Sequence, residues 1–112
     1  MRIIEKIEKF VKENNKKILY VLSYPGRTIA KYINEGIRFD TELIKFIKAK
    51  NLPYIDLMEL HSQDYLQYNL EMKSYINKYF IGHYNPLGNF FCAYGIKDRL
   101  VEMLDPKPFP YR

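Results

Sequence analysis

The sequence contains no tryptophan, one cysteine and only two histidines among its 112 residues. A single cysteine excludes an internal disulfide and a cysteine-based zinc site, and we expect Cys92 to be a buried, inert thiol on the inward face of a helix. No apolar run approaches the ~18–20 residues that a membrane-spanning helix needs, and the N-terminus lacks the apolar core of a signal peptide. We therefore expect a cytoplasmic protein that does not associate with membranes.

Aromatic residues are abundant instead, because 11 Tyr and 7 Phe make up 16% of the chain. Tyrosine combines an apolar ring with a polar hydroxyl, so we expect many of these rings at the edge of a core or at an interface. The hydrophobic fraction of 47% is that of a globular protein. A chain of this length predicts one small domain over residues 1–112.

The net charge of +5 is concentrated in the N-terminal half of the chain. Residues 1–50 hold 12 Lys/Arg against 6 Asp/Glu, whereas residues 51–112 hold 6 against 7. Acidic and basic residues alternate at four-residue spacing near the N-terminus, which is typical of a solvated helix face and argues against a phosphate-binding stripe. These pairs are Glu5–Lys9, Glu8–Lys12 and Glu13–Lys17.

Apolar residues that recur every three or four positions predict helices in five segments. The segments are 2–14, 27–34, 41–50, 63–79 and 86–104, and of these 27–34 is a candidate short helix within the ambiguous stretch 27–39. Asp40 and Ser62 are the expected N-caps of the third and fourth helices. Asn85 is the expected N-cap of the last helix, with Pro86 at its first position. Residues 105–112 are a Pro-rich tail that cannot be helical.

Two segments are predicted to be strands. Residues 18–24 form a continuous apolar run, which is typical of a strand buried on both faces of a parallel sheet. Residues 52–60 are the second candidate, with Ile55 and Leu57 at their apolar centre. Strands that alternate with helices predict the α/β class with a small parallel sheet. A strand as apolar as 18–24 needs neighbours on both sides, so either helices cover it or a second chain extends the sheet.

The segment 82–89, Gly-His-Tyr-Asn-Pro-Leu-Gly-Asn, carries the most specific signal. His83, Asn85 and Gly88 follow a His-x-Asn-x-x-Gly spacing directly before a predicted helix. This motif, with the order of elements before it, resembles the C-terminal part of SGNH (GDSL-like) hydrolases. The resemblance implies a partial flavodoxin-like three-layer sandwich, in which a small parallel sheet is flanked by helices. It covers nearly all of this chain, but only about the second half of a full family member.

The resemblance makes His83 the catalytic base of an ester hydrolase, which takes the proton of a serine that attacks the ester carbonyl. Two departures from the family pattern matter. The family's acid, three residues before the histidine, falls at Phe80. The Gly-Asp-Ser nucleophile block and the oxyanion-hole Gly and Asn have no counterpart here. We therefore expect a hydrolase fragment that is inactive alone and needs a chain, or a second copy, to supply the missing half of the sheet.

The chain's own three serines are alternative nucleophiles. Ser23 follows the first predicted strand, but it precedes a Tyr-Pro-Gly turn rather than a helix and lacks the strained elbow of serine hydrolases. Ser62 is better interpreted as a helix cap and Ser74 as an exposed helix position. None of the three is expected to be catalytic.

Three carboxylates could replace the missing acid. Asp56 and Glu59 lie near the end of the second predicted strand, where the sites of α/β proteins gather, and Asp64 follows them. A metal site formed by His61, His83 and a carboxylate is conceivable, although no ligand spacing supports it. His83 could also close a loop by hydrogen bonding, without chemistry. We expect no cofactor and no bound metal.

Two functions of different classes remain open. The first is an SGNH-like hydrolase fragment that acts on esters when it is complete. The second is a non-enzymatic α/β interaction domain that self-associates through an open sheet edge, because unpaired edge strands are templates for pairing. Nucleic-acid binding is the weakest alternative.

Overall fold

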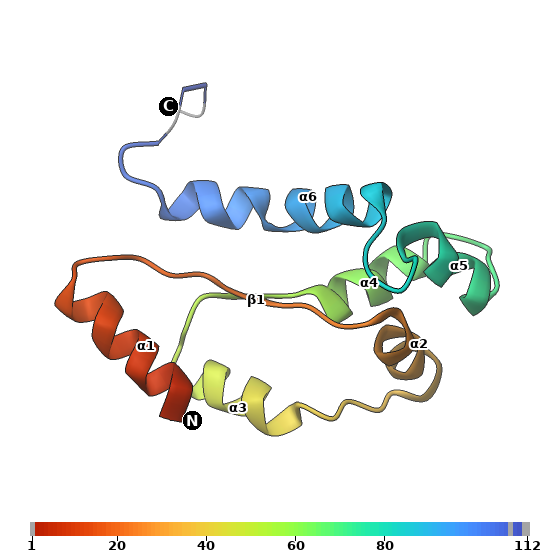
Figure 1. Cartoon of the computed structure of the whole chain (residues 1–112), viewed down its shortest axis with the longest axis horizontal. Coiled ribbons are helices and arrows are strands. Elements are labelled where there is room, and N and C mark those ends of the chain that lie inside the picture. The colour runs from red at the N-terminus through yellow and green to blue at the C-terminus, as the bar shows by residue number, and fades with distance from the viewer. Residues whose placement is uncertain (1, 108, 111–112) are drawn as a thin grey trace.

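The computed structural model describes residues 2–107 and 109–110. Within them the chain forms six helices and two parallel strands, which confirms the α/β class (Figure 1). The elements, in order, are α1 (Arg2–Glu13), β1 (Tyr20–Leu22), α2 (Gly26–Glu35), α3 (Thr41–Ala49), β2 (Tyr54–Asp56), α4 (Leu57–Tyr65), α5 (Met72–Tyr79) and α6 (Pro86–Met103).

Both strands are shorter than the sequence predicts. The three residue pairs of the sheet are Tyr20–Tyr54, Val21–Ile55 and Leu22–Asp56. The strand β2 ends at Asp56 because its carboxylate accepts a hydrogen bond from the Met58 backbone N–H and so begins α4. The prediction that residues 57–60 are strand is therefore wrong. The prediction of full burial is also wrong for β1, since Val21 at its centre is 38% exposed.

The helix predicted over 63–79 is two helices, α4 and α5, separated by residues 66–71. Ser62 lies inside α4 and is not a cap. Asp40 does occupy the N-cap position of α3, but its carboxylate makes no capping bond. Asn85 and Pro86 begin α6 as predicted, and the Asn85 side chain accepts a hydrogen bond from the Gly88 N–H.

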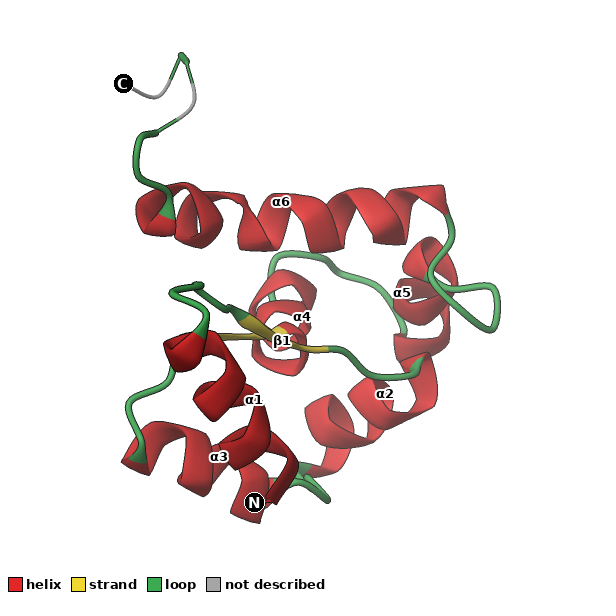
Figure 2. Cartoon of the chain, turned by 60° about the vertical axis from the view of Figure 1, so that its left-hand side comes forward, coloured by secondary structure: helices red, strands yellow, loops and turns green. Residues whose placement is uncertain are grey.

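The strand pair lies between helices. Figures 1 and 2 both place α6 on one side of it and α1 and α3 on the other. The described chain measures 47 × 37 × 22 Å, and its radius of gyration is 16.0 Å. A compact domain of about 100 residues has a radius of gyration near 13 Å, so this chain is a thin body.

The buried core lies on the side of α2, α4 and α5 and is rich in tyrosine. Tyr75 is fully buried, as is His61 beside it. The other members of this core are Tyr24, Ile29, Met58, Tyr79 and Phe80. Of the helices that the structure describes, none has the length and apolar character to cross a membrane.

Candidate functional site

His83 lies on a tight loop between α5 and α6. Phe80 and Tyr84 form an antiparallel bridge at the base of this loop, and the Ile81 N–H donates to the His83 carbonyl over 2.7 Å. Gly82 has a φ of 87°, a left-handed conformation that glycine adopts without strain. The loop therefore projects the His83 side chain into solvent, where it is exposed.

The Asn-x-x-Gly part of the motif joins this loop to α6. The Asn85 side chain caps the Gly88 N–H and also donates to the Lys78 carbonyl on α5. A Cβ atom at Gly88 would lie 2.3 Å from the Tyr79 carbonyl oxygen and 2.3 Å from Cδ1 of Tyr84. Only glycine fits there, so the spacing of the motif fixes the start of α6 against α5.

The hydrogen bond made by His83 selects its tautomer. Nδ1 lies 2.7 Å from the backbone carbonyl oxygen of Tyr84. A carbonyl oxygen only accepts hydrogen bonds, so Nδ1 carries the proton in this geometry. The other ring nitrogen, Nε2, then has a free lone pair, which is the state that a general base requires.

A hollow of about 540 Å³ opens beside the imidazole of His83. One wall is formed by Ser23, Tyr24 and Pro25 after β1, and the other by residues of the His83 loop and by Asn89 on α6. The structure thus brings Ser23 and His83 to the same hollow. It also starts α2 at Gly26, three residues after Ser23, where the sequence indicated only a turn. Within the described residues, no hydrogen bond joins the two side chains.

The acid position of the family is filled by a core residue. The Phe80 ring is buried and stacks on Tyr84, with 4.6 Å between the ring centroids. The three substitute carboxylates all have other partners. Asp56 accepts from Arg38, Glu59 from the Tyr32 hydroxyl, and Asp64 from the hydroxyls of Tyr75 and Tyr79. The hydrogen-bond partner of His83 is therefore the backbone carbonyl of Tyr84 and none of these carboxylates.

His61, the second histidine, is buried and fully hydrogen-bonded. Its Nδ1 lies 2.8 Å from the Tyr75 hydroxyl, and its Nε2 lies 2.6 Å from the Tyr84 hydroxyl. Because the Tyr75 hydroxyl donates to Asp64, it accepts from Nδ1, and the Tyr84 hydroxyl donates to Nε2. Burial lowers the pKa of His61 to about 4, with the charge of Asp64 opposing this shift.

These contacts exclude the conceivable metal site, since both nitrogens of His61 are bound to tyrosine hydroxyls. In the described part of the chain, no three His, Cys, Asp or Glu side chains gather as metal ligands. The contacts also give His61 a role that the sequence did not indicate. It fixes the ring of Tyr84, whose carbonyl orients His83.

The remaining candidate nucleophiles do not line the hollow. Ser62 is half-buried within α4, and Ser74 is exposed on α5, as predicted. Cys92 is half-buried on α6, and burial raises the pKa of its thiol. A thiol of raised pKa stays protonated, which fits the inert role predicted for it.

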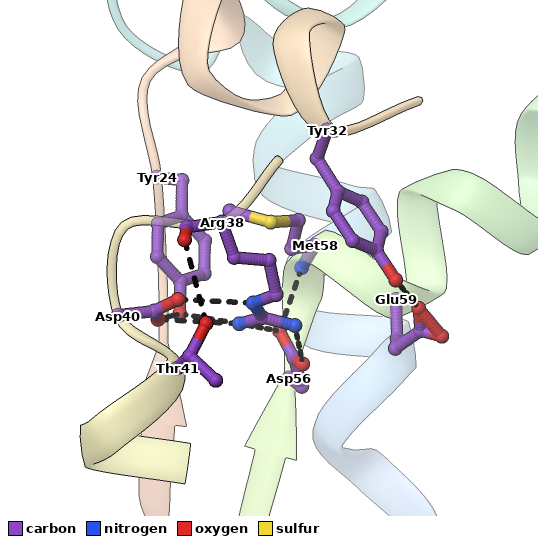
Figure 3. Close-up of polar contacts among 8 residues, drawn as sticks. All are labelled: Tyr24, Tyr32, Arg38, Asp40, Thr41, Asp56, Met58 and Glu59. Atoms are coloured by element: carbon purple, nitrogen blue, oxygen red, sulfur yellow. Dashed lines mark hydrogen bonds and ion pairs between the residues drawn. The ribbon is translucent and has the colours of Figure 1, made fainter. Parts of the chain in front are cut away.

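A second polar cluster lies at the carboxyl ends of both strands (Figure 3). Arg38, in the loop between α2 and α3, binds Asp40 and Asp56 through its guanidinium, and the Tyr24 hydroxyl donates to Asp40. Its guanidinium also lies 5.3 Å from the centroid of the Tyr32 ring. Burial would raise the pKa of Asp40, but the hydrogen bonds from Arg38 and Tyr24 outweigh it and lower that pKa.

Sequence reasoning missed Arg38 altogether. The only signal was an Arg-x-Asp pair in a loop and a further Asp at a predicted strand. The guanidinium of Arg38 binds the carboxylates of Asp40 and Asp56 and the hydroxyl of Tyr24. The cluster therefore links the α2–α3 loop to the sheet. It offers no free group for chemistry in its present arrangement.

The chain matches no protein-family model, no curated protein and no solved structure. Inference about function therefore starts from the hollow beside His83. This hollow combines an accessible imidazole, a selected tautomer and a position at the carboxyl end of a parallel strand, where α/β proteins bind ligands.

Proposed function

We propose that this chain is the base-bearing part of an SGNH (GDSL-like) ester hydrolase of flavodoxin-like, three-layer architecture, and that it is inactive alone. The observation that carries the proposal is the hydrogen bond from His83 Nδ1 to the Tyr84 carbonyl, which leaves the Nε2 lone pair in an open hollow. The tight packing of Gly88 supports it further, because it supplies a physical reason for the spacing of the His-x-Asn-x-x-Gly motif.

The chemistry assigned to His83 is general base and then general acid catalysis. Nε2 takes the proton of a serine hydroxyl as the serine oxygen attacks the carbonyl carbon of an ester. The imidazolium then gives this proton to the departing alcohol, and a water molecule repeats the sequence to release the acid. The Tyr84 carbonyl holds Nδ1–H throughout. A neutral carbonyl stabilises the imidazolium less than a carboxylate does, so this base is weaker than that of a full triad.

The serine comes from another segment or chain that extends the sheet. Support for this comes from the exposure of Val21 at the centre of β1 and from the thinness of the body, 22 Å, across a sheet of only two strands. A strand added beside β1 would set its own side chains next to Val21 on the same face of the sheet. It would also end at the same edge as β1, which is the edge on which the hollow lies.

An esterase assay tests the proposal in two steps. The purified chain should not hydrolyse a p-nitrophenyl ester faster than its His83→Ala variant does. Translation of the DNA upstream of the first codon should then reveal an in-frame strand followed by Gly-Asp-Ser. The polypeptide that includes this segment should turn over the ester and lose the activity on His83→Ala.

Three results would count against the proposal. Turnover by the chain alone that His83→Ala abolishes would show that no serine is missing. The absence of the upstream segment would show that the chain is not a truncated product. Activity of the longer polypeptide that survives His83→Ala would show that His83 is not the catalytic base.

The tautomer itself is measurable because the chain has only two histidines. Nitrogen-15 spectra of the imidazole rings should show both His61 and His83 protonated at Nδ1 at neutral pH. A His83 ring protonated at Nε2 would contradict the geometry from which its role as base is argued.

The alternative function is a non-enzymatic interaction domain that self-associates through the edge of its sheet. The exposure of Val21 favours it as well, because an apolar residue at the centre of a strand is normally covered. The mass of the chain in solution, with variants of this residue, tests the alternative.

A further inference from the structure

We propose that Ser23 and Asn89 together bind the carbonyl oxygen of a neutral ester in the hollow beside His83. The inference rests on the proposed function and deepens it, because it names the group of the substrate that this chain recognises without its partner. It also gives Ser23 a role as a hydrogen-bond donor rather than as the nucleophile.

The hollow presents polar groups that have no partner within the described part of the chain. Five of its lining residues carry polar side-chain atoms, but two of these are already used. The Tyr24 hydroxyl donates to Asp40, and the Tyr84 hydroxyl donates to His61. The side chains of Ser23 and Asn89 make no hydrogen bond within the described part of the chain, and both are exposed to the hollow.

These two side chains complement His83 chemically. The hydroxyl of Ser23 and the amide of Asn89 are donors, whereas Nε2 of His83 is an acceptor. They come from different elements, Ser23 from the turn after β1 and Asn89 from the first turn of α6. An acyl oxygen placed between them would receive two hydrogen bonds while its carbon stays beside the base. This division of donors and acceptor is the one that acyl transfer requires.

The charge of the hollow selects the ligand class. Among the described residues that line it, none is Lys, Arg, Asp or Glu. A site for phosphate or another dianion would present cationic side chains, because neutral donors alone do not offset the desolvation of such an ion. The rings of Phe80 and Tyr84 and the ring of Pro25 supply apolar surface. A volume of about 540 Å³ is within the range of small-molecule sites and suits a short acyl ester.

Binding can be measured without turnover, because the isolated chain should leave an ester intact. Methyl butyrate is titrated into the nitrogen-15-labelled chain, and the backbone amides of Ser23 and His83 and the side-chain amide of Asn89 are followed. We expect saturable shifts at all three residues. Butyl methyl ether has the same length but no carbonyl oxygen, so it should cause no saturable shift there.

Substitutions test whether the two hydrogen-bond donors contribute to ester binding. Ser23→Ala and Asn89→Asp should each weaken methyl butyrate binding about three- to tenfold, which is the loss of one hydrogen bond. Asn89→Asp keeps the shape of the side chain, and a carboxylate in the first turn of α6 suits the helix dipole, so the fold is preserved. Ser74→Ala and Asn77→Ala are the matched controls, since both residues are exposed on α5. They should bind as the parent does.

The results divide clearly. Equal binding by the parent, Ser23→Ala and Asn89→Asp would overturn the inference, as would equal shifts with the ether and the ester. His83→Ala should keep ester binding, because the base does not hold the carbonyl oxygen. Loss of esterase activity in the longer polypeptide tests His83 alone, so a failure of the proposed function and a failure of this site give different results.

Discussion

At the scale of single residues, the chain contains a matched pair of helical glycines, both on α6. A Cβ at Gly88 would approach the Tyr79 backbone oxygen to 2.3 Å, and neither helix can yield there without moving. A Cβ at Gly95 would approach Cδ1 of Leu60 to 2.9 Å and Cδ2 of Leu57 to 3.9 Å, and both atoms are the ends of flexible side chains.

We predict that Gly88→Ala lowers the free energy of unfolding by about 1–3 kcal/mol through overpacking. Gly95→Ala should stay within about 1 kcal/mol of the parent, because alanine favours the helix and offsets the closer contact. Urea unfolding of both variants measures the difference. Equal stability of the two variants would contradict the tight packing of α6 on α5.

The buried imidazole of His61 gives stability a dependence on pH. Its pKa is about 4 in the folded chain, against 6.5 for an exposed histidine. Between these values the unfolded chain binds more protons than the folded chain does, so stability is lost as the pH falls from 6.5 towards 4. The expected loss is about 3 kcal/mol.

This loss is measured by urea unfolding at several pH values in a His83→Gln background, where His61 is the remaining histidine. A free energy of unfolding that stays constant between pH 6.5 and pH 4.5 would contradict the burial of a neutral ring. Above pH 7 the free energy of unfolding should be constant, with either histidine or glutamine at position 83.

Residue-scale roles could be predicted only where the partners are close in sequence. The cap formed by Asn85 joins residues three positions apart and was expected, whereas the close packing of Gly88 on α5 was not. The hydrogen bonds of His61 join it to Tyr75 and Tyr84, which are 14 and 23 residues away. No periodicity encodes such a contact, so the sequence could offer His61 only as a possible metal ligand.

At the scale of secondary-structure elements, Arg38 is the link between the α2–α3 loop and the ends of both strands. Arg38→Met would leave the carboxylates of Asp40 and Asp56 nearly buried and without a counter-ion. We predict a loss of about 3–5 kcal/mol in the free energy of unfolding at pH 7. Arg99→Met is the matched control, because its ion pair with Glu102 is exposed and should contribute less than about 1 kcal/mol.

Chemical denaturation tests this difference, and a second substitution sharpens it. Adding Asp40→Asn to Arg38→Met removes one uncompensated charge and should recover part of the lost stability. If the two arginine variants were equally stable, the cluster would be a surface feature and not a link between elements.

The elements themselves were predicted unevenly, for physical reasons. The helices α1, α3 and α6 have strong apolar periodicity or clear end signals, and their limits fall close to the expected ones. Residues 27–39 carried no such pattern, so α2 was only a candidate. The boundary between β2 and α4 was missed because Asp56 ends the strand and caps the helix at once. The apolar run through Leu60 hid this change, since buried strand and buried helix share the same composition.

At the scale of the whole molecule, the exposed centre of β1 predicts association. We expect the chain to have a mass in solution above the 13.5 kDa of one copy, as measured by light scattering. Val21→Lys should reduce the mass to that of one copy, because a charge would lie in the surface that a partner covers. Ile3→Lys adds the same charge at an exposed position on α1 and should leave the mass in solution unchanged. A parent chain that is monomeric at all concentrations would contradict the prediction.

Tyr84 belongs to the interior through its hydroxyl and to the hollow through its carbonyl. A substitution among its ring partners, such as Phe80 or His61, can therefore turn the imidazole of His83 without touching it. In a screen of variants for activity of the completed enzyme, such interior positions would score as loss of function although the protein is folded and present. The positions at which substitution abolishes activity would then include the neighbours of Tyr84 as well as the residues that line the hollow. Such a position should not be taken as evidence of direct contact with the substrate.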